Sequence, residues 1–567
     1  MVCFHLIKWN DNMNHLRPIK QLPTHEVENM PPYIGNQDLW KNDKNLREAV
    51  NREGAGWAEK NLSAFGHLMG CTEMFDHAEK ANKNPPELKA FDQYGNRINY
   101  VDYHPSYHHL LGVAIKNEIP SFAWNHKKEG SQVAHMALTY MFSQVEGGVM
   151  CPMAMTYSVI PALKHNPDLE AQWLPKVLSN EYDDRDIPID QKLGGTIGMF
   201  MTEKQGGSDV RANSTRAKPV SSSVGNGSEY LLTGHKYFCS APMCDAFLVL
   251  ANTDVGLSCF LVPRWKPDGE RNSFFIQRLK DKLGNRSNAS SEIELDDTFG
   301  TMIGEEGKGI KTILDMVIGN RIYCAVSSAS LMRQAVVQVL HHTTHRLAFQ
   351  KKLIDQPLMK NVIADMILES DAAANLAMRV ARSVDYQEED ENEKSISRIF
   401  TTVSKYWITK RAPYLIFEAL ECHGGPGYIE ESIMPRLYRE APLNSIWEGS
   451  GNVMCVDVLR AMQKDKNAIS SVFNELEKAR GLNAYYDLNV DNLFLELKNP
   501  EDLEIKSRSI TERLATLMQA SIFLKNCNEE IASAFCSSRL GGNWTGAFGT
   551  LNSNTNFDEI IKRALPT

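Results

Sequence analysis

Residues 199–210 read MFMTEKQGGSDV, a stretch that joins an apolar run to a threonine and then to a Gly-Gly-Ser turn. Adjacent glycines let the backbone approach a ligand closely, and hydroxyls and free N–H groups supply hydrogen-bond donors to it. The same residue types also suit an ordinary surface turn. The stretch therefore predicts either a turn that contacts a ligand or an ordinary surface turn. Other segments of the chain are needed to distinguish the two.

A second segment, GHKYFCSAP at 234–242, places Phe238 two residues before Ser240 on a predicted strand. Residues two apart on a strand face the same side, so the ring and the hydroxyl can meet one planar ligand. The alternative interpretation is a core aromatic residue beside a solvated serine.

A third segment, NSIWEGSGN at 444–452, places Glu448 between Trp447 and a glycine turn. Partial desolvation beside the tryptophan tends to raise the pKa of a carboxyl group, which makes it a better proton acceptor. The alternative is helix capping. A helix is predicted to begin directly after the segment, and Ser450 or Asn452 would cap it while Glu448 complements its positive end.

Helical and strand patterns divide the rest of the chain. Between residues 62 and 178, apolar residues recur three and four positions apart, which predicts packed helices. Short β-rich runs then stand between turn residues, at 246–250, 257–262 and 291–295. Helical spacing resumes at 310–348, 357–383 and 395–422, and continues from 453 to the end.

This order predicts a segregated α+β fold rather than an alternating Rossmann pattern. We expect five segments. They are an N-terminal arm (1–60), an N-terminal helical domain (61–195), a β-barrel or sandwich domain (196–305), a helical bundle (306–460) and an additional C-terminal helical domain (461–567).

Composition indicates a globular protein, because 43% of the 567 residues are hydrophobic and 23% are charged. No run of about 18 apolar residues occurs, so we expect a soluble protein without a membrane span. The 61 Lys and Arg against 70 Asp and Glu give a net charge of −9, which lacks the positive field of non-specific DNA-binding proteins. DNA is therefore not expected as the main partner.

The eleven cysteines form no C-x-x-C pair, which favours a reducing compartment. The first twenty residues contain three Lys or Arg but no continuous apolar signal core, so they suit a weak mitochondrial presequence or a polar arm. We expect an intracellular location, in the mitochondrial matrix or the cytoplasm. The HHTTH run at 341–345 lacks metalloprotease spacing, and no metal site is predicted.

Six motifs in fixed order resemble the acyl-CoA dehydrogenase family. They are T-E-x-x-x-G-S-D at 202–209, G-x-K-x-[WF]-x-[ST] at 234–240, K-x-G-x-R-S at 282–287, R-x-x-F at 346–349, G-G-x-G-Y at 424–428 and [YW]-E-G-[ST] at 447–450. Two segments, TEKQGGSDVRANSTRA at 202–217 and PLNSIWEGSGNVMCVDVLR at 442–460, are similar to the AidB branch of that family. The resemblance therefore covers nearly the whole chain.

The resemblance implies FAD between the β domain and the bundle. Thr202 would contact the pyrimidine side of the flavin, Ser240 would lie near N5, and Phe238 would cover one face where the family usually has Trp. The implied cofactor contacts within the subunit are Met199, Met201, Thr202, Gly207, Ser208, Phe238, Cys239, Ser240, Trp447, Gly449, Ser450 and Asn452.

A second implied set reaches the FAD of a neighbouring subunit, which implies a homotetramer built as a dimer of dimers. This set comprises Arg346, Phe349, Glu421, Gly424 and Gly425. The sequence departs from the family at two positions in this region. Glu421 occupies a position where the family often has Gln, and Gln350 occupies the position after the phenylalanine, where the family often has Gly.

The implied reaction converts a medium- or long-chain fatty acyl-CoA to a trans-2-enoyl-CoA. Glu448 would remove the α-proton, and Ser208, Arg321 and Trp447 would contact the substrate. A helix-surface salt bridge is the alternative role for Arg321. The small side chains at 150–162 line an acyl tunnel or plain core. The family's usual electron acceptor is electron-transfer flavoprotein.

Two other functions compete with a dehydrogenase. One is a slow-turnover protein that sequesters acyl-CoA and so regulates lipid metabolism. The other is a DNA-associated protection protein, suggested by the AidB resemblance. Residues 461–567 hold 12 Lys and Arg against 14 Asp and Glu, a net charge of −2, which argues against DNA because phosphate contacts dominate DNA affinity.

Overall fold

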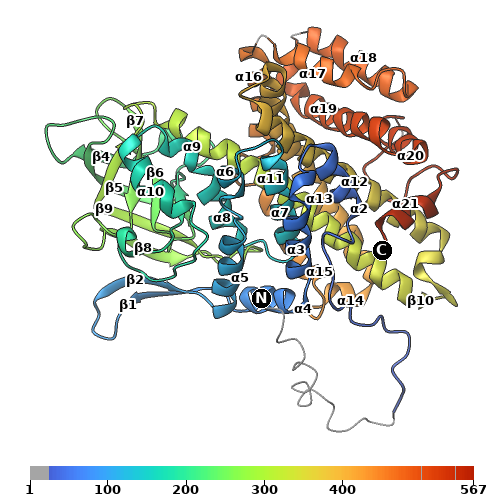
Figure 1. Ribbon diagram of the computed structural model, residues 1–567, viewed down its shortest axis with the longest axis horizontal. Helices are drawn as coiled ribbons and strands as arrows, with labels where there is room; N and C mark the ends of the chain where they lie inside the picture. The colour runs from blue at the N-terminus through green and yellow to red at the C-terminus, as the bar shows by residue number, and fades with distance from the viewer. Residues whose placement is uncertain (1–23, 466, 500, 543, 567) are drawn as a thin grey trace.

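The computed structural model describes residues 24–566 except 466, 500 and 543. Figure 1 shows a β domain at one side, N-terminal helices between it and a bundle of long helices, and further helices above one end of that bundle. The segregated α+β architecture predicted from the sequence is confirmed.

The N-terminal part is helical, with helices already present inside the predicted arm. Its helices are α2 (Lys44–Arg52), α3 (Glu59–Met69), α4 (Thr72–Lys83), α5 (Pro105–Lys116), α6 (Phe122–Asn125), α7 (Ser131–Ser143), α8 (Met150–Ser158), α9 (Ile160–Leu163) and α10 (Pro167–Val177).

An antiparallel hairpin interrupts these helices, within the stretch 62–178 for which packed helices alone were predicted. The hairpin consists of β1 (Glu87–Phe91) and β2 (Arg97–Asp102). Arg97 Nη2 donates to the carbonyl of Ile276 over 3.1 Å, and Asn99 Nδ2 donates to the carbonyl of Phe274 over 3.1 Å. Contacts with a distant strand therefore stabilise the hairpin, and local spacing does not encode them.

The β domain is a closed barrel, which decides between the two predicted forms. Its strands are β3 (Ile197–Phe200), β4 (Arg216–Pro219), β5 (Glu229–Ser240), β6 (Ala246–Asn252), β7 (Leu257–Pro263), β8 (Phe274–Leu279) and β9 (Ser290–Ile303). The order is β3-β6-β4-β5-β9-β7, β8 pairs with β9, and an additional β6–β7 pairing closes the ring. The three predicted β-rich runs all lie on strands of this barrel.

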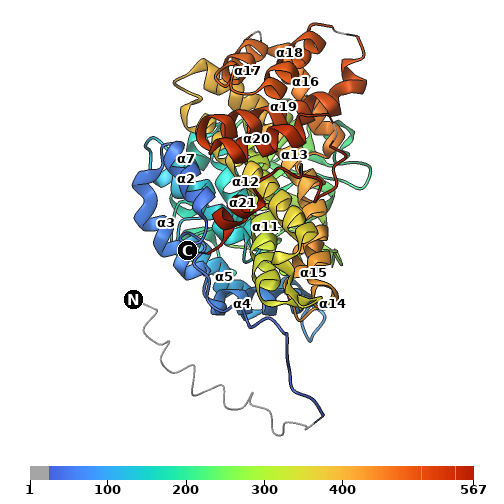
Figure 2. The ribbon, with the colours of Figure 1, turned by 90° about the vertical axis from the view of Figure 1, so that its right-hand side faces the viewer.

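Three long helices lie side by side in the bundle (Figures 1 and 2). They are α11 (Gly309–His345), α12 (Pro357–Tyr386) and α13 (Glu391–His423), which confirms the three predicted helices. The short strands β10 (Leu347–Ala348) and β11 (Lys351–Lys352) follow α11, and α14 (Gly425–Tyr428), α15 (Met434–Glu440) and α16 (Gly451–Lys464) follow α13.

The last helices cover one end and one side of the bundle (Figure 2). They are α17 (Ala468–Glu477), α18 (Ala484–Lys498), α19 (Leu503–Asn526), α20 (Glu529–Arg539) and α21 (Phe557–Ala564). Buried Arg539 pairs with Asp365 over 2.6 Å and with Glu369 over 2.9 Å, both on α12. These ion pairs fix the additional helices on the bundle. Among the described residues, no helix combines the length and the apolar character needed to cross a bilayer.

Candidate active site

Glu448 lies in the turn between the short helix η7 (Leu443–Ser445) and α16, in an uncommon backbone conformation. Its φ is +57°, and Gly449 follows with φ +104°. A non-glycine residue in the left-handed region costs of order 1–3 kcal/mol, and such residues cluster at functional sites. The surrounding structure therefore holds the turn that carries this carboxylate at the start of α16.

Burial raises the pKa of Glu448 to about 7, while the positive charges of Arg321 and Lys405 act in the opposite direction. Lys405 donates to the carbonyl of Gly449, and burial lowers its own pKa to about 8. The carboxyl group can therefore exchange a proton near neutral pH, as a general base requires. This is the behaviour predicted from its position beside Trp447.

Arg321 is buried, which removes the surface salt bridge as an interpretation. Its Nη1 pairs with Asp457 of α16 over 2.8 Å, and its Nε donates to the carbonyl of Glu448 over 3.3 Å. Arg398 of α13 also pairs with Asp457, over 2.8 Å. Arg321 thus ties the turn that carries Glu448 to α11.

The helix-capping alternative is wrong for this turn. Ser450 is the residue that precedes α16, but its side chain makes no capping hydrogen bond, and neither does another side chain. Asn452 instead accepts a hydrogen bond from Arg508 of α19, from Nε to Oδ1 over 2.9 Å.

Three parts of the chain meet around Glu448. Cys151 of α8 lies close to Ser240 of β5 and within electrostatic range of Glu448. Cys324 of α11 lies close to Trp447 and within electrostatic range of Glu448. The predicted catalytic residue, one substrate contact and one flavin contact are therefore brought together. The side chains at 150–162 mostly belong to the apolar core.

Successive side chains of β5 point to opposite faces of the strand, so the three predicted flavin contacts on it are divided between two faces. Phe238 is 49% exposed and Ser240 is partly buried, whereas Cys239 between them is fully buried on the opposite face. The hydroxyl of Ser240 lies 3.0 Å from that of Ser290. Phe238 and Ser240 thus lie on one side of β5, and the Cys239 side chain points to the other.

The turn after β3 is packed onto β5. The N–H of Tyr237 donates to the carbonyl of Thr202 over 2.8 Å. A Cβ on Gly207 would lie 2.9 Å from Thr202 Oγ1, so glycine is required for the turn to pass this close to the threonine. Ser208 is exposed at the same turn. Met199 and Met201, at the end of β3, are partly buried.

A buried ion pair that the sequence did not assign supports this turn. Glu203 Oε1 lies 2.7 Å from Lys236 Nζ, and both side chains have no exposed surface. Glu203 also accepts hydrogen bonds from Thr215 Oγ1 over 2.6 Å and from the backbone N–H of Ser214 over 2.7 Å. Both charged residues stand in matched motifs, but a motif does not show which of its members pair.

The set expected to reach a neighbouring subunit lies at the other end of the bundle, near α14 and β10 (Figures 1 and 2). His342 of α11 and His423 of α13 have ring centroids 4.7 Å apart, so the end of α11 before Arg346 lies beside the end of α13 before Gly424. Within this chain, these residues lie apart from the turn with Glu448. Glu421 is exposed on the last turn of α13.

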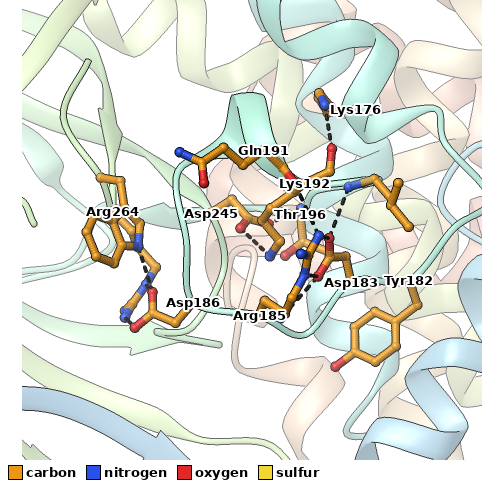
Figure 3. Close-up of polar contacts among 12 residues, drawn as sticks. Lys176, Tyr182, Asp183, Arg185, Asp186, Gln191, Lys192, Thr196, Asp245 and Arg264 are labelled. Atoms are coloured by element: carbon orange, nitrogen blue, oxygen red, sulfur yellow. Dashed lines mark hydrogen bonds and ion pairs between the residues drawn. The ribbon is translucent and has the colours of Figure 1, made fainter. Parts of the chain in front are cut away.

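A small recess of about 60 Å³ between α5 and the barrel is lined by Ala241, the neighbour of Ser240, but by none of the predicted site residues. Figure 3 shows its charged wall, where Asp245 accepts from Lys192 over 2.6 Å and from the N–H of Thr196 over 2.8 Å. Asp186 pairs with Arg264 over 2.9 Å. These carboxylates are neutralised by partners, so the wall fixes the segment 181–196 against the barrel.

Three family models match successive parts of the chain. The "Adaptive response protein AidB N-terminal domain" matches residues 29–184. The "Acyl-CoA dehydrogenase, middle domain" matches residues 198–298, and the "Acyl-CoA dehydrogenase, C-terminal domain" matches residues 307–463.

Whole proteins match over most of their length. The Escherichia coli protein named "Putative acyl-CoA dehydrogenase AidB" is 43% identical over 515 residues, which covers 90% of this chain and 94% of that protein. A structure titled Caenorhabditis elegans ACDH-11 in complex with C11-CoA superposes with a TM-score of 0.83 at 24% identity, covering 92% of this chain and 94% of that one. A Bacillus anthracis acyl-CoA dehydrogenase complexed with FAD gives 0.66 at 16% identity, covering 94% and 91%. These two structures establish the fold.

Proposed function

Because the chain belongs to the AidB-like branch of the acyl-CoA dehydrogenase family, its cofactor is FAD, and we propose that it dehydrogenates a medium- or long-chain fatty acyl-CoA with Glu448 as the base. The observation that carries the proposal is the pKa of about 7 that burial gives Glu448 in its fixed turn.

The side chains around Ser240 fit the cofactor. Phe238 offers a half-exposed ring and Ser240 a hydroxyl on the same side of β5, as a flat ring system requires. Thr202 stands beside them because the backbone of Gly207 and the N–H of Tyr237 hold its turn. We also assign to this cofactor the other contacts within the same subunit that the family resemblance implies.

In the proposed reaction, the acyl thioester loses a proton from its α-carbon and a hydride from its β-carbon. The Glu448 carboxylate takes the α-proton of the thioester, and the β-hydrogen leaves as hydride, so that a trans-2-enoyl-CoA forms. When bound, FAD supplies the hydride acceptor. The backbone N–H of Glu448 would polarise the thioester oxygen, which favours loss of a weakly acidic proton. Trp447 and Ser208 are proposed substrate contacts, whereas Arg321 positions the catalytic turn.

The titration that tests the function uses acyl-CoAs of graded chain length, added without oxygen while the flavin absorbance at about 450 nm is followed. We expect bleaching by one chain-length class, and the C11-CoA bound to the Caenorhabditis elegans structure supports a medium chain. Perturbation of the spectrum without bleaching would favour acyl-CoA sequestration instead. No response to any acyl-CoA would contradict both and favour the DNA-associated role.

The bleaching rate should depend on pH through Glu448. Its pKa is raised from 4.5 to about 7, and only the ionised carboxylate accepts a proton. The rate should therefore be constant well above pH 7 and fall about tenfold per unit well below it. Stopped-flow bleaching across this range measures the midpoint. A midpoint near the ordinary glutamate value would show that the base is a different or a solvated group.

We also propose a homotetramer in which Arg346 and Phe349 reach the FAD of a neighbouring subunit, with electron-transfer flavoprotein as the electron acceptor. Phe349 is 95% exposed with φ +52° on the hairpin of β10 and β11, so its apolar ring has no cover within the chain. Phe349→Asp should lower the assembly state in sedimentation velocity and weaken FAD retention. Gln277→Asp, at an exposed polar residue of β8 in the barrel, is the control. An unchanged tetramer with unchanged FAD retention in Phe349→Asp would contradict the assignment.

A further inference from the structure

Arg508 connects the additional C-terminal helices to the catalytic turn. It lies on α19, and its Nε donates to Asn452 Oδ1 over 2.9 Å. Asn452 is in the first turn of α16, four residues after Glu448. The contact therefore joins the part of the chain beyond the acyl-CoA dehydrogenase motifs to one of the proposed FAD contacts.

The approach of α19 to this turn is close. A Cβ on Gly451 would lie 3.1 Å from Lys410 Cε, 3.4 Å from Tyr406 Cε2 and 3.5 Å from Arg508 Nη2. Glycine thus leaves little space between α13, α19 and the start of α16. One turn further along α19, Thr511 lies close to Cys455 of α16, so the two helices are also packed together beyond the turn.

Two positive side chains near this turn have no acidic partner. Arg508 and Lys410 both lie within electrostatic range of Cys455 on α16, and among the described residues neither forms an ion pair with a carboxylate. Lys405 uses its ammonium group on the carbonyl of Gly449. Two positive side chains therefore remain available to an anion beside residues 449–452.

The hydrogen bond also fixes the orientation of the Asn452 amide. Arginine has only donors, so Asn452 must turn its oxygen toward Arg508. Its NH₂ group then faces away from Arg508, and it donates to no other group among the described residues. An amide with a single orientation loses less conformational entropy when it binds a ligand.

We propose that Arg508 is a positioning residue of the FAD site, supplied by the additional helical part. It orients the Asn452 amide as a donor to the cofactor, and its charge, with that of Lys410, stabilises the FAD phosphates. This inference rests on the assignment of Gly449, Ser450 and Asn452 to the FAD site, which belongs to the proposed function.

The test measures FAD release from the diluted holoenzyme by the rise in flavin fluorescence. Arg508→Gln should bind FAD about tenfold more weakly, as expected for the loss of one charge-assisted hydrogen bond. Lys506→Gln removes the same charge two residues away on α19 and should leave FAD affinity unchanged. Arg508→Lys keeps the charge but loses the guanidinium geometry, so it should fall between wild type and Arg508→Gln.

The Asn452→Ala variant distinguishes failure of the inference about Arg508 from failure of the proposed FAD site. If Asn452→Ala weakens FAD binding but Arg508→Gln does not, Arg508 plays no part in the site and the inference is overturned. If neither variant changes FAD release, the assignment of residues 449–452 is wrong and the inference fails with it. If both weaken binding, the double variant should be less than additive, since both act through one amide. Thermal unfolding and circular dichroism check that each variant is folded.

Discussion

Glu448→Gln is expected to slow flavin bleaching by acyl-CoA about 10²–10⁴-fold, the usual contribution of a general base. Glutamine keeps the size and the hydrogen-bonding capacity of the side chain but cannot accept a proton. The loss should appear in the chemical step, because Arg321 and Lys405 hold the turn through backbone carbonyls that the substitution leaves intact.

Anaerobic stopped-flow spectroscopy measures this effect on protein loaded with FAD. The affinity for acyl-CoA and the FAD content should match those of the wild type, so that only the rate changes. Glu305→Gln, at an exposed residue that pairs with Lys308, is the matched control and should bleach at the normal rate. A Glu448→Gln variant that bleaches within a few-fold of the wild-type rate would remove Glu448 from the mechanism.

Glu203→Gln should lower the free energy of unfolding by about 3–5 kcal/mol, as expected when one partner of a buried ion pair is lost. Lys236 would keep its charge in a fully buried position without a carboxylate partner, and only neutral acceptors such as the carbonyl of Leu250, 2.7 Å away, would face it. The turn that carries Thr202 should also loosen, because Glu203 holds the N–H groups of Ser214 and Thr215.

Thermal unfolding with excess FAD measures the loss, and Glu229→Gln on the exposed side of β5 is the control. The pKa of Glu203 is lowered from 4.5 to about 2, where Lys236 is the main cause that opposes burial. A lowered folded-state pKa means that this stability is present above the ordinary pKa and is lost as the pH falls toward about 2. An unfolding temperature equal to that of Glu229→Gln would contradict a stabilising pair.

The long helices and the barrel strands could be predicted because each is encoded by local spacing of apolar residues. The three bundle helices and the strands at 246–250, 257–262 and 291–295 follow such spacing directly. The β1–β2 hairpin could not, because it depends on Asn99 and Arg97 reaching β8 some 175 and 179 residues away. Whether a turn or a sheet forms at such a place depends on a partner that a short window cannot contain.

The candidate site divides in the same way. Ordered motifs indicated Glu448, Thr202 and Ser240, since each motif requires a particular residue type at a particular spacing. Motif letters did not reveal that Glu203 pairs with Lys236, or that Arg508 reaches Asn452 from 56 residues away. Pairings of this kind arise only when the three-dimensional packing brings separate elements together.

The most direct test of Glu448 as the base is exchange of the α-hydrogen of a bound acyl-CoA with D₂O, followed by mass spectrometry under anaerobic conditions. Exchange reports proton removal alone, without the hydride step. The wild-type protein should incorporate deuterium at the α-carbon, faster above about pH 7 than below it, and Glu448→Gln should show no exchange above the rate in buffer. Equal exchange in the two proteins would contradict the central claim that this carboxylate removes the α-proton.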